Sequence, residues 1–310
     1  MRIVYFGTPD FAVESLDAIM HSSHEVVAVV TVPDRQAGRG QTVVYSPVKQ
    51  YALDHNLPLL QPEKLRDEAF LAALQAYQAD CFVVVAFRML PEAVWNMPPH
   101  GTFNLHASLL PRYRGAAPIN WAIINGEQET GVTTFLLNHH IDEGAILLQE
   151  RTPITPDDNA GTLHDRLATM GRSLVTRTLD GIADGILIPQ PQQGLPCPAP
   201  KIFKEDCRID FSRPGQQVID FIRGLAPYPA ATMTLRSQEG DEVPFKVFDA
   251  HFQKAPAATK NTLFCDGKRV LKIGVADGFV EILSLQMAGK KKNSIEEFLR
   301  GKNITNWLLV

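Results

Sequence analysis

The chain has 310 residues, of which 45% are apolar and 21% are charged, and its net charge is −4 at neutral pH. This composition is ordinary for a soluble globular protein, and the length predicts about two domains. No run of apolar residues reaches the roughly 18 that a membrane-spanning helix requires. We therefore expect no membrane association, and the net charge does not by itself indicate a nucleic-acid partner.

The charge is unevenly distributed along the chain. Residues 1–200 carry 13 Lys and Arg against 21 Asp and Glu, a net −8, whereas residues 201–310 carry 17 against 13, a net +4. A basic C-terminal part is compatible with a local surface for a polyanion. A difference of this size is also typical of ordinary solvated surface.

The cysteines indicate the redox compartment. They lie far apart without C-x-x-C spacing, which is typical of reduced thiols in a cytosolic protein rather than of a disulfide framework or a zinc site. Asp10 and Glu14 come too early for a secretory signal. We therefore expect a cytoplasmic protein without a bound metal. The cysteines are Cys81, Cys197, Cys207 and Cys265.

The first 31 residues predict a strand, a helix and a second strand. Residues 2–6 are a short apolar run that ends at Gly7. Thr8 is the expected N-cap of the helix, with Pro9 as its first residue. This order predicts a parallel sheet with right-handed crossovers. Gly7 stands alone rather than in a G-x-G-x-x-G motif, which disfavours a nicotinamide-dependent oxidoreductase.

Two loops follow predicted strands on the side where open α/β sheets bind ligands. Residues 33–42 form a polar loop in which Arg35 and Arg39 either contact phosphates or face solvent. Residues 87–91 follow the continuous apolar strand at 81–86, and their composition suits either the wall of a pocket for a flat aromatic ligand or a plug in the core. The other elements expected in this half are helices at 46–55, 67–78 and 119–125 and a short strand at 58–61.

The stretch from 101 to 118 carries the first candidate for chemistry. Residues 102–106 alternate as a strand does, so Asn104 and His106 point to one face. An amide and an imidazole at the end of a strand can donate hydrogen bonds to a developing oxyanion. They can equally be a satisfied polar pair that supports the following turn.

A predicted hairpin carries the second candidate. Residues 131–137 and 145–150 are strand-like and predict an antiparallel edge beside the parallel strands. Asp142 lies in the turn between them, where an aspartate is usually a turn former. Gly144 is the residue expected to need a positive φ.

After a long helix at 162–184 the composition changes. Five prolines within twelve residues, beginning at Pro189, indicate a semi-rigid linker. Beyond a helix at 216–224, closely spaced short strands predict a small barrel, and the lysines at 290–292 suit either RNA or solvent. The expected fold is α/β, with a Rossmann-like, mostly parallel sheet domain at 1–188, the linker at 189–206 and an OB-like β-barrel domain at 207–310. The strands expected in the barrel are 231–235, 243–250, 262–265, 270–276 and 279–286.

Several motifs together resemble the methionyl-tRNA formyltransferase family, within the wider folate-dependent formyltransferases. They are F-G-T-P-D-F-A (6–12), P-D-R-Q-A-G-R-G (33–40), S-P-V-K (46–49), N-L-H-A-S-L-L-P-R-Y-R-G-A-A-P-I (104–119), T-G-V-T…I-D-E-G (130–144) and S-L-Q-M-A-G-K-K (284–291). The resemblance covers nearly the whole chain. Two stretches depart from many relatives: the loop at 86–91 is one residue shorter, and Gln41-Thr42 replaces lysines.

The resemblance implies a reaction and a set of residues. The donor is 10-formyltetrahydrofolate, the acceptor is the α-amino group of methionyl initiator tRNA, and no metal takes part. The implied catalytic residues are Asn104, His106 and Asp142. The implied folate contacts are Ser108, Leu109, Leu110 and Pro111, with Arg88, Met89 and Leu90 in the shortened loop. The implied tRNA contacts are Arg39 first, then Arg35, Lys290 and Lys291. We expect a monomer.

Alternatives to this reading share parts of the pattern. A formyltransferase for an amino-sugar nucleotide would share Asn104, His106 and Asp142. A formyltetrahydrofolate hydrolase, in which water is the acceptor, is a further alternative. A non-catalytic RNA-binding protein with a degenerate enzyme-like domain is the remaining alternative. The complete arginine loop and the basic C-terminal part favour the tRNA enzyme.

Overall fold

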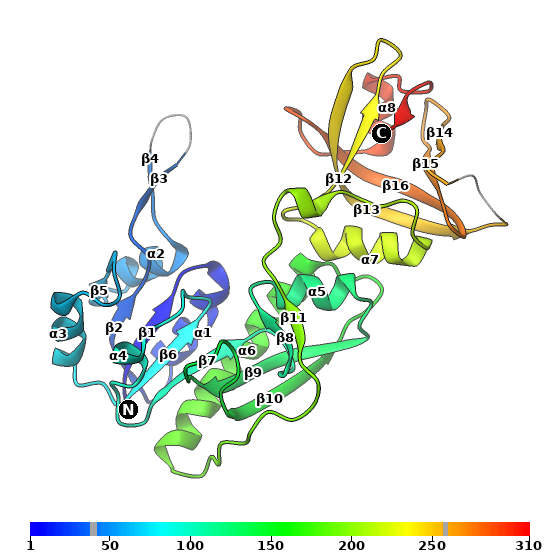
Figure 1. Ribbon diagram of the computed structural model, residues 1–310. Coiled ribbons are helices and arrows are strands. Elements are labelled where there is room, and N and C mark those ends of the chain that lie inside the picture. Colours follow the sequence, from blue (N-terminus) through cyan, green and yellow to red (C-terminus); the bar gives the residue numbers. More distant parts are fainter. Residues whose placement is uncertain (38–41, 257–259) are drawn as a thin grey trace. The chain divides into compact units, whose positions relative to one another are not determined.

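The computed structural model describes residues 1–37, 42–256 and 260–310 (Figure 1). The chain divides into two compact units, each assembled from three segments. Unit 1 comprises Met1–Pro118, Glu129–Thr152 and His164–Ala199, and unit 2 comprises Ile119–Gln128, Pro153–Leu163 and Pro200–Val310. The domain limits expected from the sequence, 1–188 and 207–310 with a linker at 189–206, stay a prediction. Among the described residues, no helix combines the length and the apolar character needed to cross a bilayer.

Unit 1 is built on a seven-stranded sheet with the order β10-β9-β7-β6-β1-β2-β5. The strands from β7 to β5 pair in parallel, and β9 runs antiparallel to β7. This arrangement confirms the mostly parallel, Rossmann-like sheet and its antiparallel edge. The bounds are β1 (Arg2–Gly7), β2 (Glu25–Val30), β5 (Leu59–Leu60), β6 (Cys81–Val85), β7 (Thr102–His106), β9 (Glu129–Leu136) and β10 (Ile146–Pro153).

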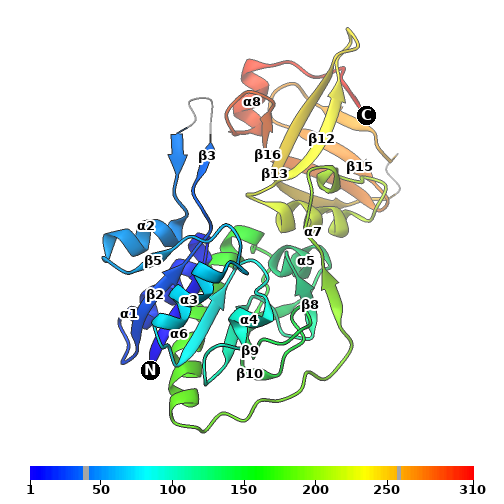
Figure 2. The ribbon, with the colours of Figure 1, turned by 60° about the vertical axis from the view of Figure 1, so that its left-hand side comes forward.

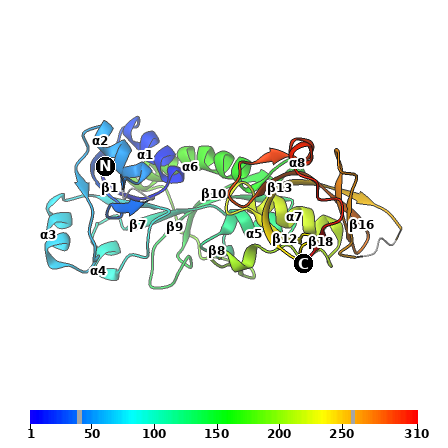
Figure 3. The same cartoon turned by 90° about the horizontal axis from the view of Figure 1, so that it is seen from above.

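Helices cover both faces of this sheet, with α1 and α6 on one face and α3 and α4 on the other (Figure 3). The two-residue alternation of the strands divides their side chains between the faces. Val4 and Phe6 of β1 pack with Phe70 and Leu74 of α3 in one core. The helices are α1 (Asp10–Met20), α2 (Pro47–Asp54), α3 (Glu68–Ala76), α4 (Glu92–Trp95) and α6 (Ala160–Ala183).

The predicted start of the first helix is wrong by one residue. Helix α1 begins at Asp10, and Pro9 rather than Thr8 is its N-cap. The Asp10 carboxylate accepts a hydrogen bond from the Phe11 amide at 3.0 Å, which supplies an acceptor in the first turn. The Thr8 carbonyl accepts a bond from the Val48 amide of α2, at 3.4 Å. Among the described residues, the buried Thr8 hydroxyl has no hydrogen-bond partner, so it does not cap the helix.

The polar loop predicted at 33–42 contains two short strands, β3 (Arg35–Ala37) and β4 (Thr42–Val44). They pair antiparallel and project from the sheet (Figure 2). The hairpin is anchored at its base, because Lys49 Nζ of α2 donates to Asp34 Oδ2 at 2.5 Å. The Ser46 hydroxyl caps α2 by accepting from the Lys49 amide. Arg39 lies outside the described residues.

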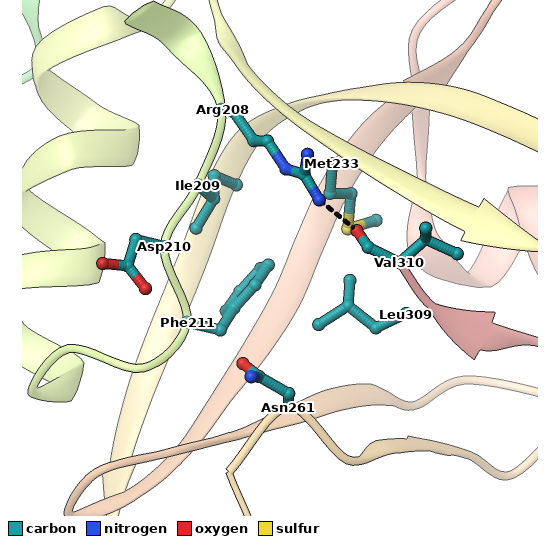
Figure 4. Close-up of a pocket in the computed structure, with 8 residues that line it drawn as sticks. All are labelled: Arg208, Ile209, Asp210, Phe211, Met233, Asn261, Leu309 and Val310. Carbon is teal, nitrogen blue, oxygen red and sulfur yellow. Dashed lines mark hydrogen bonds between the residues drawn. The ribbon is translucent and has the colours of Figure 1, made fainter.

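Unit 2 contains an antiparallel sheet that closes nearly into a barrel, as predicted. Its strand order is β14-β15-β16-β13-β12-β18, and β17 pairs with β16. Arg208 lies beside β12 and donates from Nη2 to the Val310 carbonyl at 2.7 Å (Figure 4). The elements are α5 (Pro118–Ile124), α7 (Gly215–Leu225), β12 (Ala231–Arg236), β13 (Glu242–Lys254), β14 (Leu263–Cys265), β15 (Leu271–Val275), β16 (Gly278–Met287), β17 (Asn293–Ser294), α8 (Ile295–Gly301) and β18 (Leu308–Leu309).

One pairing in unit 1 was not expected from the sequence. Strand β8 (Arg112–Gly115) pairs in parallel with β11 (Cys197–Ala199), which lies in the proline-rich stretch. The Ala117 amide extends this contact by donating to the Ala199 carbonyl at 3.1 Å. A β-carbon on Gly115 would lie 2.6 Å from the same carbonyl oxygen, so the close approach requires glycine there.

Candidate active site

The candidate site lies at the carboxyl end of β7, inside unit 1. Strand β7 pairs with β6 on one side and β9 on the other, and Asn104 and His106 project from the same face. In open α/β sheets the crevice beyond the carboxyl ends of the strands is where ligands bind. The strand prediction for 102–106 is confirmed residue for residue.

His106 is buried and held in one orientation. Its Nε2 lies 2.7 Å from the Tyr113 carbonyl oxygen. Because a carbonyl oxygen only accepts, Nε2 must carry a hydrogen, so the other ring nitrogen is the one whose protonation can change. That nitrogen, Nδ1, lies 3.9 Å from Asp142 Oδ2, with both side chains largely buried.

Asp142 is fixed by its backbone and by a neighbouring strand. Its φ is 53°, a left-handed conformation that aspartate tolerates better than most residues. The Gly115 amide donates to Asp142 Oδ2 at 2.9 Å, which aims the carboxylate toward β8 and His106. The prediction that Gly144 needs a positive φ is wrong, because Asp142 takes that role. Gly144 is required for space, since a β-carbon there would lie 1.5 Å from the Leu136 carbonyl oxygen.

Asn104 is half-buried, two residues before His106. Within residues 1–37, 42–256 and 260–310, no hydrogen-bond partner is recorded for its carboxamide, which leaves that group available to a ligand. An amide nitrogen in this position can donate to an oxygen that gains negative charge. The sequence allowed two interpretations of this pair, as donors to an oxyanion or as satisfied polar groups. The second interpretation therefore fits His106 better than Asn104.

The turn after β7 uses most of its polar groups internally. The Ser108 hydroxyl donates to the Arg112 carbonyl at 2.6 Å, and Gln149 Nε2 donates to the Leu110 carbonyl at 3.0 Å. Ser108, Leu110 and Pro111 are buried, whereas Leu109 is partly exposed. A ligand here would therefore contact the surface of the turn and the Leu109 side chain rather than the Ser108 hydroxyl.

The loop after β6 divides between core and surface. Leu90 is 4% exposed and belongs to the core beneath α3 and α4, whereas Met89 is 65% exposed. The Arg88 guanidinium donates to the Pro62 carbonyl and, at 2.9 Å, to the Glu63 carbonyl. Burial, and secondarily Arg35, lowers the pKa of Arg88. Leu90 is thus a core residue, and Met89 is the member of the loop most accessible to a ligand.

The predicted tRNA contacts lie on exposed segments. Arg35 is exposed in β3. Lys290 and Lys291 are exposed after β16 and line a hollow of 450 Å³, which Lys302 and α8 also line. Arg39 lies outside the described residues. Among the described residues, no group of three or more His, Cys, Asp or Glu side chains is placed to hold a metal ion.

Sequence reasoning missed the residues that hold Asp142 in place. Besides the Gly115 amide, Gln192 donates from Nε2 to the Asp142 carbonyl at 2.7 Å and to the Gly144 carbonyl at 3.0 Å. Gln192 lies fifty residues further along the chain in the proline-rich stretch. No local pattern marks it, because a glutamine in such a stretch is typical of an extended linker.

Comparison with known proteins identifies relatives over the full length of the chain. Residues 1–179 match a family model described as "Formyl transferase" and residues 201–303 match "Formyl transferase, C-terminal domain". The chain is 55% identical to a methionyl-tRNA formyltransferase of Bacteroides fragilis, covering 98% of this chain and 96% of that protein. It is 54% identical to the enzyme of the same name from Bacteroides thetaiotaomicron, covering 99% and 97%.

A solved structure with a similar fold is more distant. WlaRD, a sugar 3N-formyl transferase determined in the presence of dTDP and 5-N-formyl-THF, aligns with a TM-score of 0.66 over 94% of this chain and 99% of its own. The sequence identity is 20%, so this likeness concerns the fold alone.

Proposed function

Because the chain belongs to the methionyl-tRNA formyltransferase family, we propose that Asn104, His106 and Asp142 are the residues with which it performs formyl transfer. The enzyme transfers the formyl group of 10-formyltetrahydrofolate to the α-amino group of methionyl initiator tRNA. The observation that carries the assignment is the approach of His106 Nδ1 to Asp142 Oδ2, at 3.9 Å, on the strand that also carries Asn104, whose carboxamide has no hydrogen-bond partner among the described residues.

The reaction needs donors for an oxyanion. Attack of the amine on the formyl carbon forms a tetrahedral intermediate whose oxygen carries negative charge. Asn104 Nδ2 donates one hydrogen bond to this oxygen. His106 donates the other from Nδ1, because Nε2–H is already bound to the Tyr113 carbonyl. A preorganised donor of this kind contributes roughly 3–4 kcal/mol.

The same step needs a group that receives a proton. The Asp142 carboxylate, whose Oδ2 lies 3.9 Å from His106 Nδ1, takes the proton that the attacking amine loses, directly or through a water. The Gly115 amide keeps the carboxylate oriented for this task, at 2.9 Å from Oδ2.

The substrates would be held by different parts of the chain. We assign the folate to the turn at 108–111 and the loop at 88–90, where Leu109 and Met89 are the accessible side chains. We assign the tRNA to Arg39, to Arg35 of β3 and to Lys290 and Lys291, since cations that contact phosphates supply affinity without reading sequence. All three catalytic groups come from unit 1, which supports a monomer, and reduced thiols support a cytoplasmic enzyme.

The test is an acceptor comparison with 10-formyltetrahydrofolate as donor. Methionyl initiator tRNA should be formylated much faster than methionyl elongator tRNA. An amino-sugar nucleotide and plain buffer serve as the competing acceptors. Faster formylation of the sugar nucleotide, or release of formate without an acceptor, would overturn the proposed substrate. Asp142→Asn should remove most of the transfer to initiator tRNA while leaving the thermal unfolding midpoint within a few degrees, and full activity in that variant would overturn the catalytic assignment.

A further inference from the structure

Gln192 makes an unusual set of contacts for a residue in a linker-like stretch. Its carboxamide nitrogen donates to the Asp142 and Gly144 carbonyls, at 2.7 and 3.0 Å. Its carboxamide oxygen accepts from Arg114 Nε at 3.1 Å and Nη2 at 2.6 Å. The side chain is only partly exposed, and both ends of the amide are used. A group with all its polar atoms engaged has one preferred orientation.

The contacts of Gln192 reach a turn in which a non-glycine residue has a positive φ. Asp142 has a φ of 53°, and a left-handed conformation costs about 1–2 kcal/mol for most L-residues. Such a conformation persists when its surroundings over-determine it. Here the bonds from Gln192 hold the carbonyls on both sides of Glu143, and Gly144 lies tight against the Leu136 carbonyl.

Arg114 connects Gln192 to the Glu143 side chain and to strand β8. Its Nη1 donates to Glu143 Oε1 at 2.7 Å, so Arg114 joins Gln192 to the side chain between Asp142 and Gly144. The next residue along β8, Gly115, binds the Asp142 carboxylate directly. The stretch that carries Gln192 is itself attached at two points, by Gln190 to Ile146 at the start of β10 and by β11 to β8.

We propose that Gln192 is a positioning residue for catalysis, which sets the backbone of Asp142 so that its carboxylate faces His106. This inference rests on the proposed catalytic role of Asp142. Gln192 does not touch the reacting groups. Its effect passes through the Asp142 turn, and a misplacement of about 1 Å at a reacting group can cost roughly a hundredfold in rate.

The test uses Gln192→Ala and Gln192→Glu, with Gln193→Ala as the matched control. Gln193 is the adjacent residue and is exposed. The glutamate variant keeps an acceptor for Arg114 but loses the donor to the two carbonyls. We expect both Gln192 variants to lower kcat by about 10- to 100-fold while KM for the folate and for the tRNA changes less than about threefold. Gln193→Ala should be unaffected. Unchanged kcat in both Gln192 variants, or an equal loss in Gln193→Ala, would overturn the inference.

A second measurement does not depend on activity. Hydrogen exchange at the Gly115 amide reports on its bond to Asp142, so exchange there should accelerate in Gln192→Ala and stay unchanged in Gln193→Ala. Unchanged exchange in both would overturn the inference. Asp142→Asn distinguishes a failure of the role of Gln192 from a failure of the proposed function. Full activity in that single variant contradicts the proposed function itself. If Asp142→Asn is slow, Gln192→Ala added to it should cause no further loss, and an additive loss would show that Gln192 acts elsewhere.

Discussion

The Asp142 turn and the β3–β4 hairpin both extend beyond the sheet of unit 1, but they are held in opposite ways. The turn is braced by the Gly115 amide, by Gln192 and by the close packing of Gly144. The hairpin is anchored at its base by Lys49, and Val43 and Val44 of β4 are more than half exposed.

The roles proposed above for the two segments account for this difference. A group that moves a proton must stay within about an ångström of its target. A cation that attracts a phosphate acts over a Debye length of about 8 Å at physiological salt, so precise placement matters less. With these proposed roles, we expect bracing by several contacts at the group that moves a proton, and attachment at the base alone, here by Lys49 and Gln61, in the segment that binds a large partner.

The largest expected effect comes from the braced side of this comparison. His106→Ala and Asp142→Ala should each lower kcat by roughly 10²- to 10⁴-fold, because each removes a group that acts in the transition state. Steady-state formylation of methionyl initiator tRNA measures the loss, with circular dichroism and the melting temperature as controls for folding. Turnover close to that of the wild type in either variant would show that the turn is braced for another reason.

Asn104→Ala should have the next largest effect. Removing one oxyanion donor costs about 10²- to 10³-fold in kcat. KM for either substrate should change little, because the bond is made mainly in the transition state. Asn104→Asp serves as the companion variant, since it keeps the size of the side chain but cannot donate when ionised. If Asn104→Ala raised KM and left kcat unchanged, Asn104 would be a binding residue only.

For the proposed tRNA contacts, Arg39→Ala should act on tRNA alone. The apparent affinity for charged tRNA should fall severalfold, and the slope of its logarithm against the logarithm of salt concentration should decrease by about one. The affinity for 10-formyltetrahydrofolate should stay the same. Gln41→Ala is the neutral control in the same stretch. Equal weakening of folate binding would mean that Arg39 does not act on tRNA binding separately from folate binding.

The smallest effect concerns the hairpin's anchor. The hydrogen bond from Lys49, and then that from Gln61, holds the pKa of Asp34 below its usual range. A carboxylate with a lowered folded-state pKa stabilises the fold above its unfolded pKa, and this contribution is lost as the pH falls through the folded value. Lys49→Met should therefore lower the melting temperature at pH 7, and the gap to the wild type should shrink below about pH 4. A gap that stays constant with pH would mean that Lys49 acts through packing alone, for example on the Tyr45 ring 4.0 Å away.

Much of the fold could be predicted from the sequence because its signals are local. The continuous apolar run at 81–86 is the central strand β6, and alternation at 102–106 placed Asn104 and His106 on one face of β7. Short strands with turn signals predicted the barrel of unit 2. A period of two residues is visible in a few consecutive positions, so a strand can be predicted without knowledge of distant contacts.

The errors share a physical cause. The positive φ in the hairpin turn fell on Asp142 rather than Gly144, in a turn that Gln192 holds from fifty residues further along the chain. The strand β8 is only four residues long, and it pairs with β11 from the proline-rich stretch. In each case the deciding partner lies far along the chain.

The sequence by itself determined the parallel sheet, the barrel and the identity of the three candidate catalytic residues, since each depends on nearby residues or on a motif. Only the tertiary structure decided which nitrogen of His106 faces Asp142, and that Gln192 braces the turn that carries this carboxylate. Hydrogen bonds between segments about fifty residues apart form only when the loops between them have closed, and no local pattern encodes that closure.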